Sequence, residues 1–208
     1  MRFPRSCGTL VHPTSFPGKY GIGDFGYEAR EFINFLEQTN QTIWQVLPLT
    51  PTGYGNSPYA SYSAFAGNAY LISPDILVEK GLLTKSEAEK AALPSRLEVD
   101  YEGAFQQKDV LFKLACDRFY KNLDSVEEKK FKAFKKENKH WLDDYTLFMA
   151  CGKHHGMQPW NTWEKEIAQR KPEALKKFRK KYNADIKLLN WQQYEFYNQW
   201  MALKQYAN

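Results

Sequence analysis

Two short apolar runs near the start of the chain flank a segment with the apolar spacing of a helix. The runs are Thr9–Val11 and Ile43–Leu47, and the second contains one polar residue, Gln45. A strand that is apolar on both faces is typical of a sheet covered on both sides, so we predict two buried strands. The helical segment extends from about Glu28 to Asn40. Its apolar face consists of Ala29, Phe32, Ile33 and Leu36.

A strand, a helix and a second strand in this order form a βαβ unit, which implies parallel strands. The loops that follow the two strands are residues 12–26 and 50–68. In a parallel pair both loops leave the same end of the sheet, where α/β proteins place their active sites. We therefore expect the two loops to converge on one face.

Beyond residue 68 the pattern is mainly helical. We predict a short edge strand at Asn68–Ile72, an extended segment at Val99–Tyr101, and a series of helices from Ala104 onward. The last helix is expected from about Asp185 to Asn208. The helix after Ala104 is expected to bury one set of side chains, namely Phe105, Val110, Leu111, Leu114 and Phe119.

Composition and charge narrow the class of protein. A chain of 208 residues with 43% hydrophobic and 16% aromatic residues is expected to fold, and no apolar run reaches the ~20 residues of a membrane span. The net charge of +5 lies largely in lysine-rich helical stretches with interspersed glutamates, which indicates solvated helix faces and no nucleic-acid partner. The N-terminus does not resemble a secretory signal, and the three cysteines are far apart, so a reducing cytoplasm is expected.

The loop of residues 50–68 combines flat aromatic faces with small polar groups. Its rings are Tyr54, Tyr59, Tyr62 and Phe65, and its small polar side chains include Ser57 and Asn56. Sugars have apolar ring faces and rims of hydroxyl groups, so this mixture favours a sugar site. A surface loop whose tyrosines pack on the scaffold below is the alternative. Composition alone leaves both open.

Four blocks of sequence resemble the 4-alpha-glucanotransferase family, the amylomaltases or disproportionating enzymes. They are LVHPTSFPGKYGIGDFG, WQVLPLTPTGYGNSPYASYSAFAGNAYLI, WLDDYTLFMA and QWMALKQYAN, and they are spread from Leu10 to Asn208. The resemblance implies an α/β fold: the N-terminal portion of a (β/α)8 TIM barrel, about its first two strands, with a largely helical insertion.

The resemblance also implies an organisation in three parts. Residues 1–73 are expected to start the catalytic barrel and carry substrate-binding loops, and residues 74–184 to form a mainly helical insertion subdomain. Residues 185–208 are expected to form a helix that returns to the barrel, with the chain stopping before the third strand. We therefore expect an exposed barrel edge beside an apolar surface that includes Phe32, Trp44, Phe196 and Trp200, through which the fragment self-associates.

Members of the family are retaining enzymes, which need two carboxyl groups ~5–5.5 Å apart across the glycosidic bond. The resemblance places all the catalytic carboxylates after later barrel strands, so no catalytic residue is expected in this chain. Asp143 and Asp144 are adjacent on a helix, point about 100° apart and cannot clasp one bond. Asp24 is expected to cap a helix or hold a glycine-rich turn.

Four residues are carried over from the family as substrate-binding. Ser57 and Tyr59 match positions that line the substrate cleft, and the surrounding GYGNSPY matches residue for residue. Tyr54 and Tyr101 match positions of a second glucan-binding groove. For Tyr101 the alternative is an aromatic residue in the core of the insertion.

We expect no cofactor and no metal. The histidines are His12, His140, His154 and His155. His154 and His155 are neighbours, and His12 stands alone before Pro13, so satisfied or exposed histidines are predicted. GIGDFG lacks the spacing of a dinucleotide-binding loop.

The leading interpretation is the N-terminal part of a cytoplasmic 4-alpha-glucanotransferase, which transfers α-1,4-glucan segments between maltodextrins by retaining double displacement. One alternative is an α-glucan hydrolase of related fold. The other is a non-catalytic fragment that binds glucan. The expected partners are α-1,4-glucan oligosaccharides, with no nucleic acid and no membrane.

Overall fold

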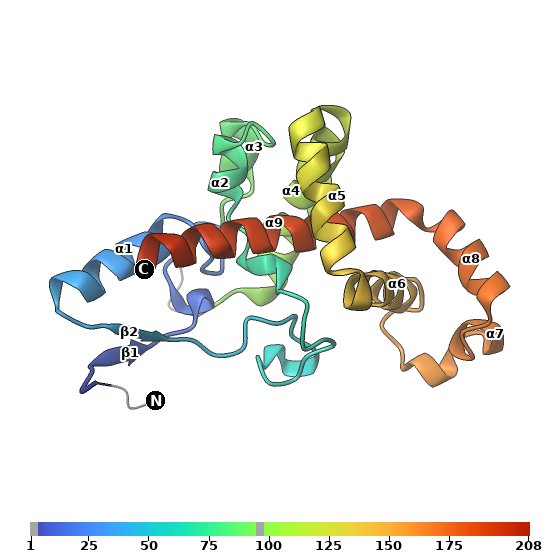
Figure 1. Ribbon diagram of the computed structural model, residues 1–208, viewed down its shortest axis with the longest axis horizontal. Coiled ribbons are helices and arrows are strands. Elements are labelled where there is room, and N and C mark those ends of the chain that lie inside the picture. The colour runs from blue at the N-terminus through green and yellow to red at the C-terminus, as the bar shows by residue number, and fades with distance from the viewer. Residues whose placement is uncertain (1–3, 95–97) are drawn as a thin grey trace. The chain divides into compact units, whose positions relative to one another are not determined.

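The predicted βαβ unit is present at the start of the chain. A computed structural model describes residues 4–94 and 98–208. In it, β1 (Gly8–Leu10) pairs in parallel with β2 (Ile43–Gln45), and Thr9 lies opposite Trp44. α1 (Tyr27–Gln38) connects the strands and lies beside them (Figure 1). The predicted parallel pairing is confirmed.

The prediction that these strands are buried on both faces is wrong for this chain. Leu10 is 53% exposed and Ile43 is 44% exposed. The sheet formed by the described residues contains only these two strands, so β2 has a neighbour on one edge. Trp44 is half-buried: its ring packs against Phe32 at 5.4 Å, and its Nε1 donates to the Val11 carbonyl at 2.9 Å.

The chain divides into two compact units. Unit 1 contains the described residues up to Asn122 together with Glu195–Asn208, and unit 2 contains Leu123–Tyr194. The last helix, α9 (Asn183–Ala207), contributes its end to unit 1 and its start to unit 2. The predicted division into residues 1–73, 74–184 and 185–208 separates a barrel from an insertion, and this division stays a prediction.

Unit 1 also contains helical elements within and after the two loops, and two of them overlap segments that were predicted to be extended. The elements are η1 (Pro13–Ser15), η2 (Tyr54–Asn56), η3 (Ala69–Leu71), α2 (Pro74–Glu79), α3 (Lys85–Lys90) and α4 (Tyr101–Lys121). The edge strand predicted at Asn68–Ile72 is wrong, because the Asn68 side chain accepts from the Tyr70 N–H at 3.1 Å and starts η3. The extended segment predicted at Val99–Tyr101 is wrong at Tyr101, where α4 begins, and Asp100 caps this helix by accepting from the Gly103 N–H.

The buried face of α4 differs from the predicted one. Val110 is 60% exposed and Leu114 is 36% exposed, whereas Leu111 and Phe119 are buried as expected. The face that enters the core also contains a charged residue, Lys108, which is fully buried. The predicted buried face was built from apolar residues only, so Lys108 was left out of it. The predicted face therefore included Val110 and Leu114, which are exposed.

The interior of unit 1 holds Lys108 in an ion pair with Asp24. The ammonium donates to Asp24 Oδ2 at 2.9 Å and to the carbonyls of Tyr70 and Ile72 at 2.8 and 3.1 Å. Three acceptors match the three N–H donors of an ammonium. Burial lowers the pKa of Lys108, an effect that the Asp24 carboxylate partly offsets. The other oxygen of Asp24 accepts from the Gly26 N–H, so the predicted role of Asp24 in a glycine-rich turn is confirmed.

The end of α9 closes unit 1 on the side of the second loop. Phe196 is 3% exposed, and its ring lies 5.3 Å from that of Phe25. A Cβ on Gly67 would lie 2.1 Å from the Phe196 ring, so only glycine fits there. The expectation that Phe196 contributes to an exposed apolar surface is therefore wrong, while Trp200 is half-buried.

Unit 2 is helical. It contains α5 (Ser125–Glu137), α6 (Lys139–His154), η4 (Trp160–Thr162), α7 (Lys165–Ala168), α8 (Pro172–Lys181) and the start of α9. Leu147, Ala150, Cys151 and Phe178 form a buried cluster. Over residues 4–94 and 98–208, none of the helices has the length and apolar character needed to cross a membrane.

Candidate functional site

The two loops converge at the carboxyl ends of the strands. The Val11 N–H donates to the Gln45 carbonyl at 3.1 Å, which continues the ladder to the start of the first loop. One residue further, His12 Nε2 lies 3.4 Å from the Pro48 carbonyl, and its Nδ1 lies 2.7 Å from Thr14 Oγ1. Burial lowers the pKa of His12, although the contact with Pro48 opposes this. The prediction that both loops leave the same end of the sheet is confirmed, and His12 starts the first of them.

The second loop contains a closed turn of ten residues. An antiparallel bridge joins Thr52 to Ser61, and the Ala60 N–H donates to the Ser57 carbonyl at 3.1 Å. At the tip, Gly55 and Asn56 have φ values of 74° and 54°, in the left-handed region. Glycine and asparagine adopt this conformation more readily than other residues, so the sequence supplies suitable residues at the tip.

Three of the predicted site residues lie on this closed turn. Tyr54 is 99% exposed and Tyr59 is 75% exposed, so their rings do not pack on the scaffold below. Ser57 is half-buried, and its Oγ accepts from the Tyr59 N–H at 3.3 Å. The alternative in which these tyrosines only pack on the scaffold does not hold for Tyr54 and Tyr59. The turn therefore exposes two aromatic rings to solvent.

The loop is anchored where it returns to the scaffold. The Asn68 N–H donates to the Leu49 carbonyl at 2.8 Å, and the hydroxyl of Tyr197 on α9 donates to the Phe65 carbonyl at 2.5 Å. Ser63 Oγ accepts from the N–H groups of Phe65 and Ala66, both at 3.1 Å. An exposed tip on a fixed base is a common arrangement for a binding loop, because the scaffold limits the freedom that the ligand must remove.

Tyr101 lies on a different element from the other three. It is the first residue of α4, is half-buried, and its ring meets Phe105 edge-on at 5.9 Å. Phe105 in turn stacks on Tyr70 at 3.9 Å. Tyr101 therefore has the packing contacts of the alternative interpretation, and its role in glucan binding stays a prediction.

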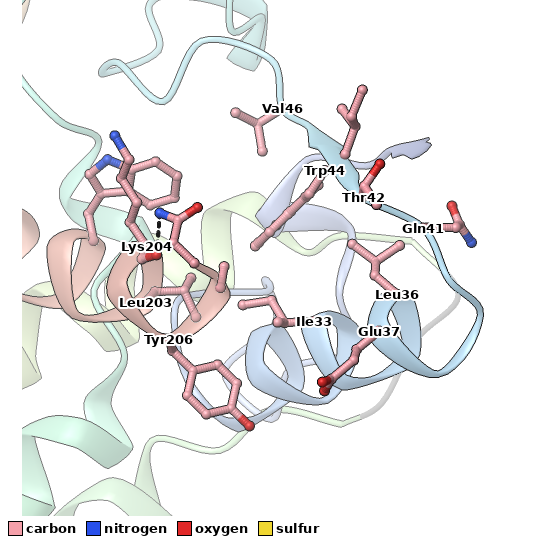
Figure 2. Close-up of a pocket in the computed structure, with 14 residues that line it drawn as sticks. Ile33, Leu36, Glu37, Gln41, Thr42, Trp44, Val46, Leu203, Lys204 and Tyr206 are labelled. Atoms are coloured by element: carbon pink, nitrogen blue, oxygen red, sulfur yellow. Dashed lines mark hydrogen bonds between the residues drawn. The ribbon is translucent and has the colours of Figure 1, made fainter. Parts of the chain in front are cut away.

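A groove of about 680 Å³ lies between α1, β2 and the end of α9 in unit 1. Figure 2 shows Ile33, Trp44 and Leu203 pointing into it. Its apolar lining comes from Ile33, Leu36, Ile43, Trp44, Val46, Trp200 and Leu203, and its polar lining includes Glu37, Gln41, Thr42 and Lys204. Sequence reasoning did not identify this groove, because Trp44 and Leu203 are distant along the chain.

Two of the carboxylates considered from the sequence form ion pairs with basic side chains. Asp24 is buried with Lys108, and Asp144 forms an exposed ion pair with Arg170 at 2.8 Å. Glu164 contacts His155 in unit 2, where His154 is close enough to form a group that could hold a metal ion. The sequence pattern missed this group because Glu164 is nine residues from His155.

Comparisons with known proteins cover nearly the whole chain. Residues 11–208 match the 4-alpha-glucanotransferase family. The 4-alpha-glucanotransferase of Clostridium butyricum is 44% identical, with 95% of this chain and 40% of that protein covered. That of Thermus thermophilus is 42% identical, with 98% and 40% covered. The chain thus spans about 40% of the length of these curated relatives.

The chain also resembles solved structures of amylomaltases. The amylomaltase of Streptococcus agalactiae in complex with acarbose matches with a TM-score of 0.92 and 40% identity, over 99% of this chain and 41% of that protein. The amylomaltase of Corynebacterium glutamicum matches with a TM-score of 0.68 and 14% identity, over 97% of this chain and 28% of that one. The second likeness concerns the fold alone.

Proposed function

Because the chain belongs to the 4-alpha-glucanotransferase family, we propose that it carries the glucan-binding loop of an enzyme that transfers α-1,4-glucan segments between maltodextrins. The observation that carries this proposal is the closed turn of residues 52–61, with Tyr54 and Tyr59 exposed at the end of the parallel strands. The relative from Streptococcus agalactiae was solved with acarbose, which supports an oligosaccharide as the ligand.

The proposed reaction is a retaining double displacement. A carboxylate attacks the anomeric carbon while a carboxylic acid protonates the leaving glucan oxygen, which gives a glycosyl ester. A hydroxyl of a second glucan then attacks the same carbon, its proton returns to the acid/base group, and the nucleophile is released. The catalytic carboxylates belong to the longer enzyme, and the contribution of this chain is substrate positioning.

The loop contributes by holding a sugar ring and limiting water. Tyr59 supplies an apolar face, and the Ser57 side chain beside it supplies a hydroxyl. A ring held in one orientation brings its hydroxyl to the glycosyl ester at a high effective concentration. Exclusion of water from the same space favours transfer over hydrolysis. We place the reaction in the cytoplasm.

We also propose that the two strands start a (β/α)8 barrel that is completed in the longer protein. Among the described residues β2 pairs with one strand only, and its residues line the groove together with Ile33 and Leu203. Parallel strands of this type are covered on both faces, and a barrel leaves no edge. Further strands would cover Ile43 and Leu10, which are exposed here.

Product analysis with maltotriose tests the activity. A protein of the relatives' length that contains this chain is expected to produce shorter and longer oligosaccharides together. Steady release of glucose without longer products would identify a hydrolase and contradict the proposal. The 208-residue chain alone is expected to show no transfer, because the resemblance to the family places the catalytic carboxylates after later barrel strands. Disproportionation by the chain alone would refute this division of roles.

The exposed sheet edge predicts self-association of the isolated chain. Leu10, Phe35 and Ile43 are 53%, 49% and 44% exposed in unit 1. Replacing Ile43 with lysine adds a charge at the free edge, and it is expected to reduce the associated fraction several-fold in sedimentation velocity. Binding of a hydrophobic dye should fall in parallel.

The matched control is Val126→Lys, which changes a valine that is 61% exposed in unit 2. This change should leave association unaltered. A wild-type chain that sediments as one monomeric species and binds no hydrophobic dye would contradict the prediction of self-association.

A further inference from the structure

Two histidines and a glutamate come together in unit 2. His154 ends α6, His155 follows it, and Glu164 precedes α7. One ligand atom from each side chain lies within 4.8 Å of the other two. The chain reverses between them through Gly156 and Met157, whose φ values are 59° and 58°. This reversal explains how a residue nine positions away reaches His155.

The orientation of His155 is fixed from two sides. Its Nδ1 lies 2.7 Å from the Cys151 carbonyl oxygen, which can only accept, so Nδ1 carries a proton. The ring stacks on Trp163 at 5.0 Å with 14° between the planes. Nε2 then faces the Glu164 carboxylate. A histidine whose second nitrogen donates to a backbone carbonyl is the arrangement that metal-bound histidines adopt.

A proton or a metal ion must lie between the two facing groups. A carboxylate oxygen and an imidazole nitrogen are both acceptors unless a proton or a metal ion joins them. The third side chain, His154, contacts the Tyr182 hydroxyl, which lies 2.6 Å from its Nδ1 and 3.0 Å from its Nε2. The rings of His154 and His155 lie 4.9 Å apart and almost perpendicular. One ligand atom of His154 therefore lies within 4.8 Å of those of His155 and Glu164.

We propose that His154, His155 and Glu164 bind a divalent transition-metal ion of the zinc class, with solvent completing the coordination. Two imidazoles and one carboxylate suit Zn²⁺, whereas Ca²⁺ and Mg²⁺ prefer oxygen ligands alone. Bonds of ~2.0–2.2 Å require ligand atoms roughly 3.5 Å apart, so the Glu164 oxygen must move away from His155 Nε2 to admit the ion. The Glu164 side chain is 63% exposed, and His154 is also exposed, so both can move.

The bound ion would join the end of α6 to the start of α7. These elements are separated by the segment from Gly156 to Trp163, which contains one short 3₁₀ turn, η4. A metal that binds the folded arrangement and not the unfolded chain raises the stability of this part. The proposal is independent of glucan transfer, and its test does not use activity.

Calorimetric titration of the tag-free 208-residue chain with Zn²⁺ tests the site. A Cys7→Ser background removes the exposed thiol that could also bind zinc. One ion per chain is expected. His155→Ala and Glu164→Gln should each weaken the binding at least about tenfold. The absorption of bound Co²⁺ should report coordination by nitrogen and oxygen and should be lost in His155→Ala.

His140→Ala is the matched control, since His140 is an exposed histidine on the same helix. It should leave both signals unchanged, and circular dichroism should show that all the variants retain their helices. Absence of saturable Zn²⁺ binding would overturn the proposal and leave a proton-mediated His155–Glu164 pair. Binding that survives both site variants, or that depends equally on His140, would overturn it as well.

Discussion

Replacing Lys108 with methionine is expected to lower the free energy of unfolding of the chain by about 3–5 kcal/mol. The substitution retains much of the side-chain volume but removes the ammonium. Asp24, which is 8% exposed, is then left as a buried charge without its partner. The carbonyls of Tyr70 and Ile72 lose a donor in the same step. Denaturant titration monitored by tryptophan fluorescence measures the change.

Lys113→Met is the matched control, because Lys113 lies on the same helix and is exposed. It should change the free energy of unfolding by no more than about 0.5 kcal/mol. A second variant, Asp24→Asn, retains an oxygen for the Gly26 N–H and removes the charge. The double variant with Lys108→Met should be destabilised by less than the sum of the two single changes. Additive effects would show that the pair is not coupled.

The consequence of this pair for the site is indirect. Asp24 lies in the first loop, and Tyr70 and Ile72 follow the second, so Lys108 joins the segments next to both loops. A buried ion pair need not add net stability compared with an apolar replacement of both partners. Here it specifies one arrangement of the segments around α4.

The sequence allowed the βαβ unit and its loops to be predicted because both depend on local patterns. Apolar runs indicated the two strands, and the spacing of Ala29 to Leu36 indicated α1. Parallel pairing then placed the loops at one end, as the contact of His12 with Pro48 confirms. The resemblance of GYGNSPY to the family directed attention to the turn with Tyr54 and Tyr59.

The features that sequence reasoning missed depend on residues far apart in the chain or on side chains that compete with the backbone. Burial of Lys108 requires Asp24, 84 residues earlier. The caps made by Asn68 and Asp100 replace extended backbone with helical turns. The exposure of Ile43 follows from the missing neighbour on one side of β2, which no local pattern reports.

The second large effect is expected at Tyr59 in a protein of the relatives' length. Tyr59→Ala should reduce kcat/KM for maltotriose by about 30–100-fold, which corresponds to roughly 2–3 kcal/mol of lost binding in the transition state. The ring is 75% exposed and has few packing contacts to lose, so the thermal midpoint should remain within a few degrees. A large effect on turnover with an unchanged fold is the signature of a residue that touches substrate.

Tyr54→Ala provides the comparison on the same loop. Tyr54 is 99% exposed and is predicted to bind glucan in a second groove. Its removal should leave maltotriose turnover unchanged and should raise KM for long glucans several-fold. Equal losses for the two variants on both substrates would indicate a general disturbance of the turn.

The most direct test of the claim that the turn of residues 52–61 positions glucan is therefore the steady-state rate of maltotriose disproportionation in the Tyr59→Ala protein. The measurement is made beside wild type and Tyr54→Ala, with circular dichroism and thermal midpoints on the same samples. The account predicts that kcat/KM falls by about 30–100-fold for Tyr59→Ala and stays at the wild-type value for Tyr54→Ala. Wild-type kinetics in a folded Tyr59→Ala protein would contradict it.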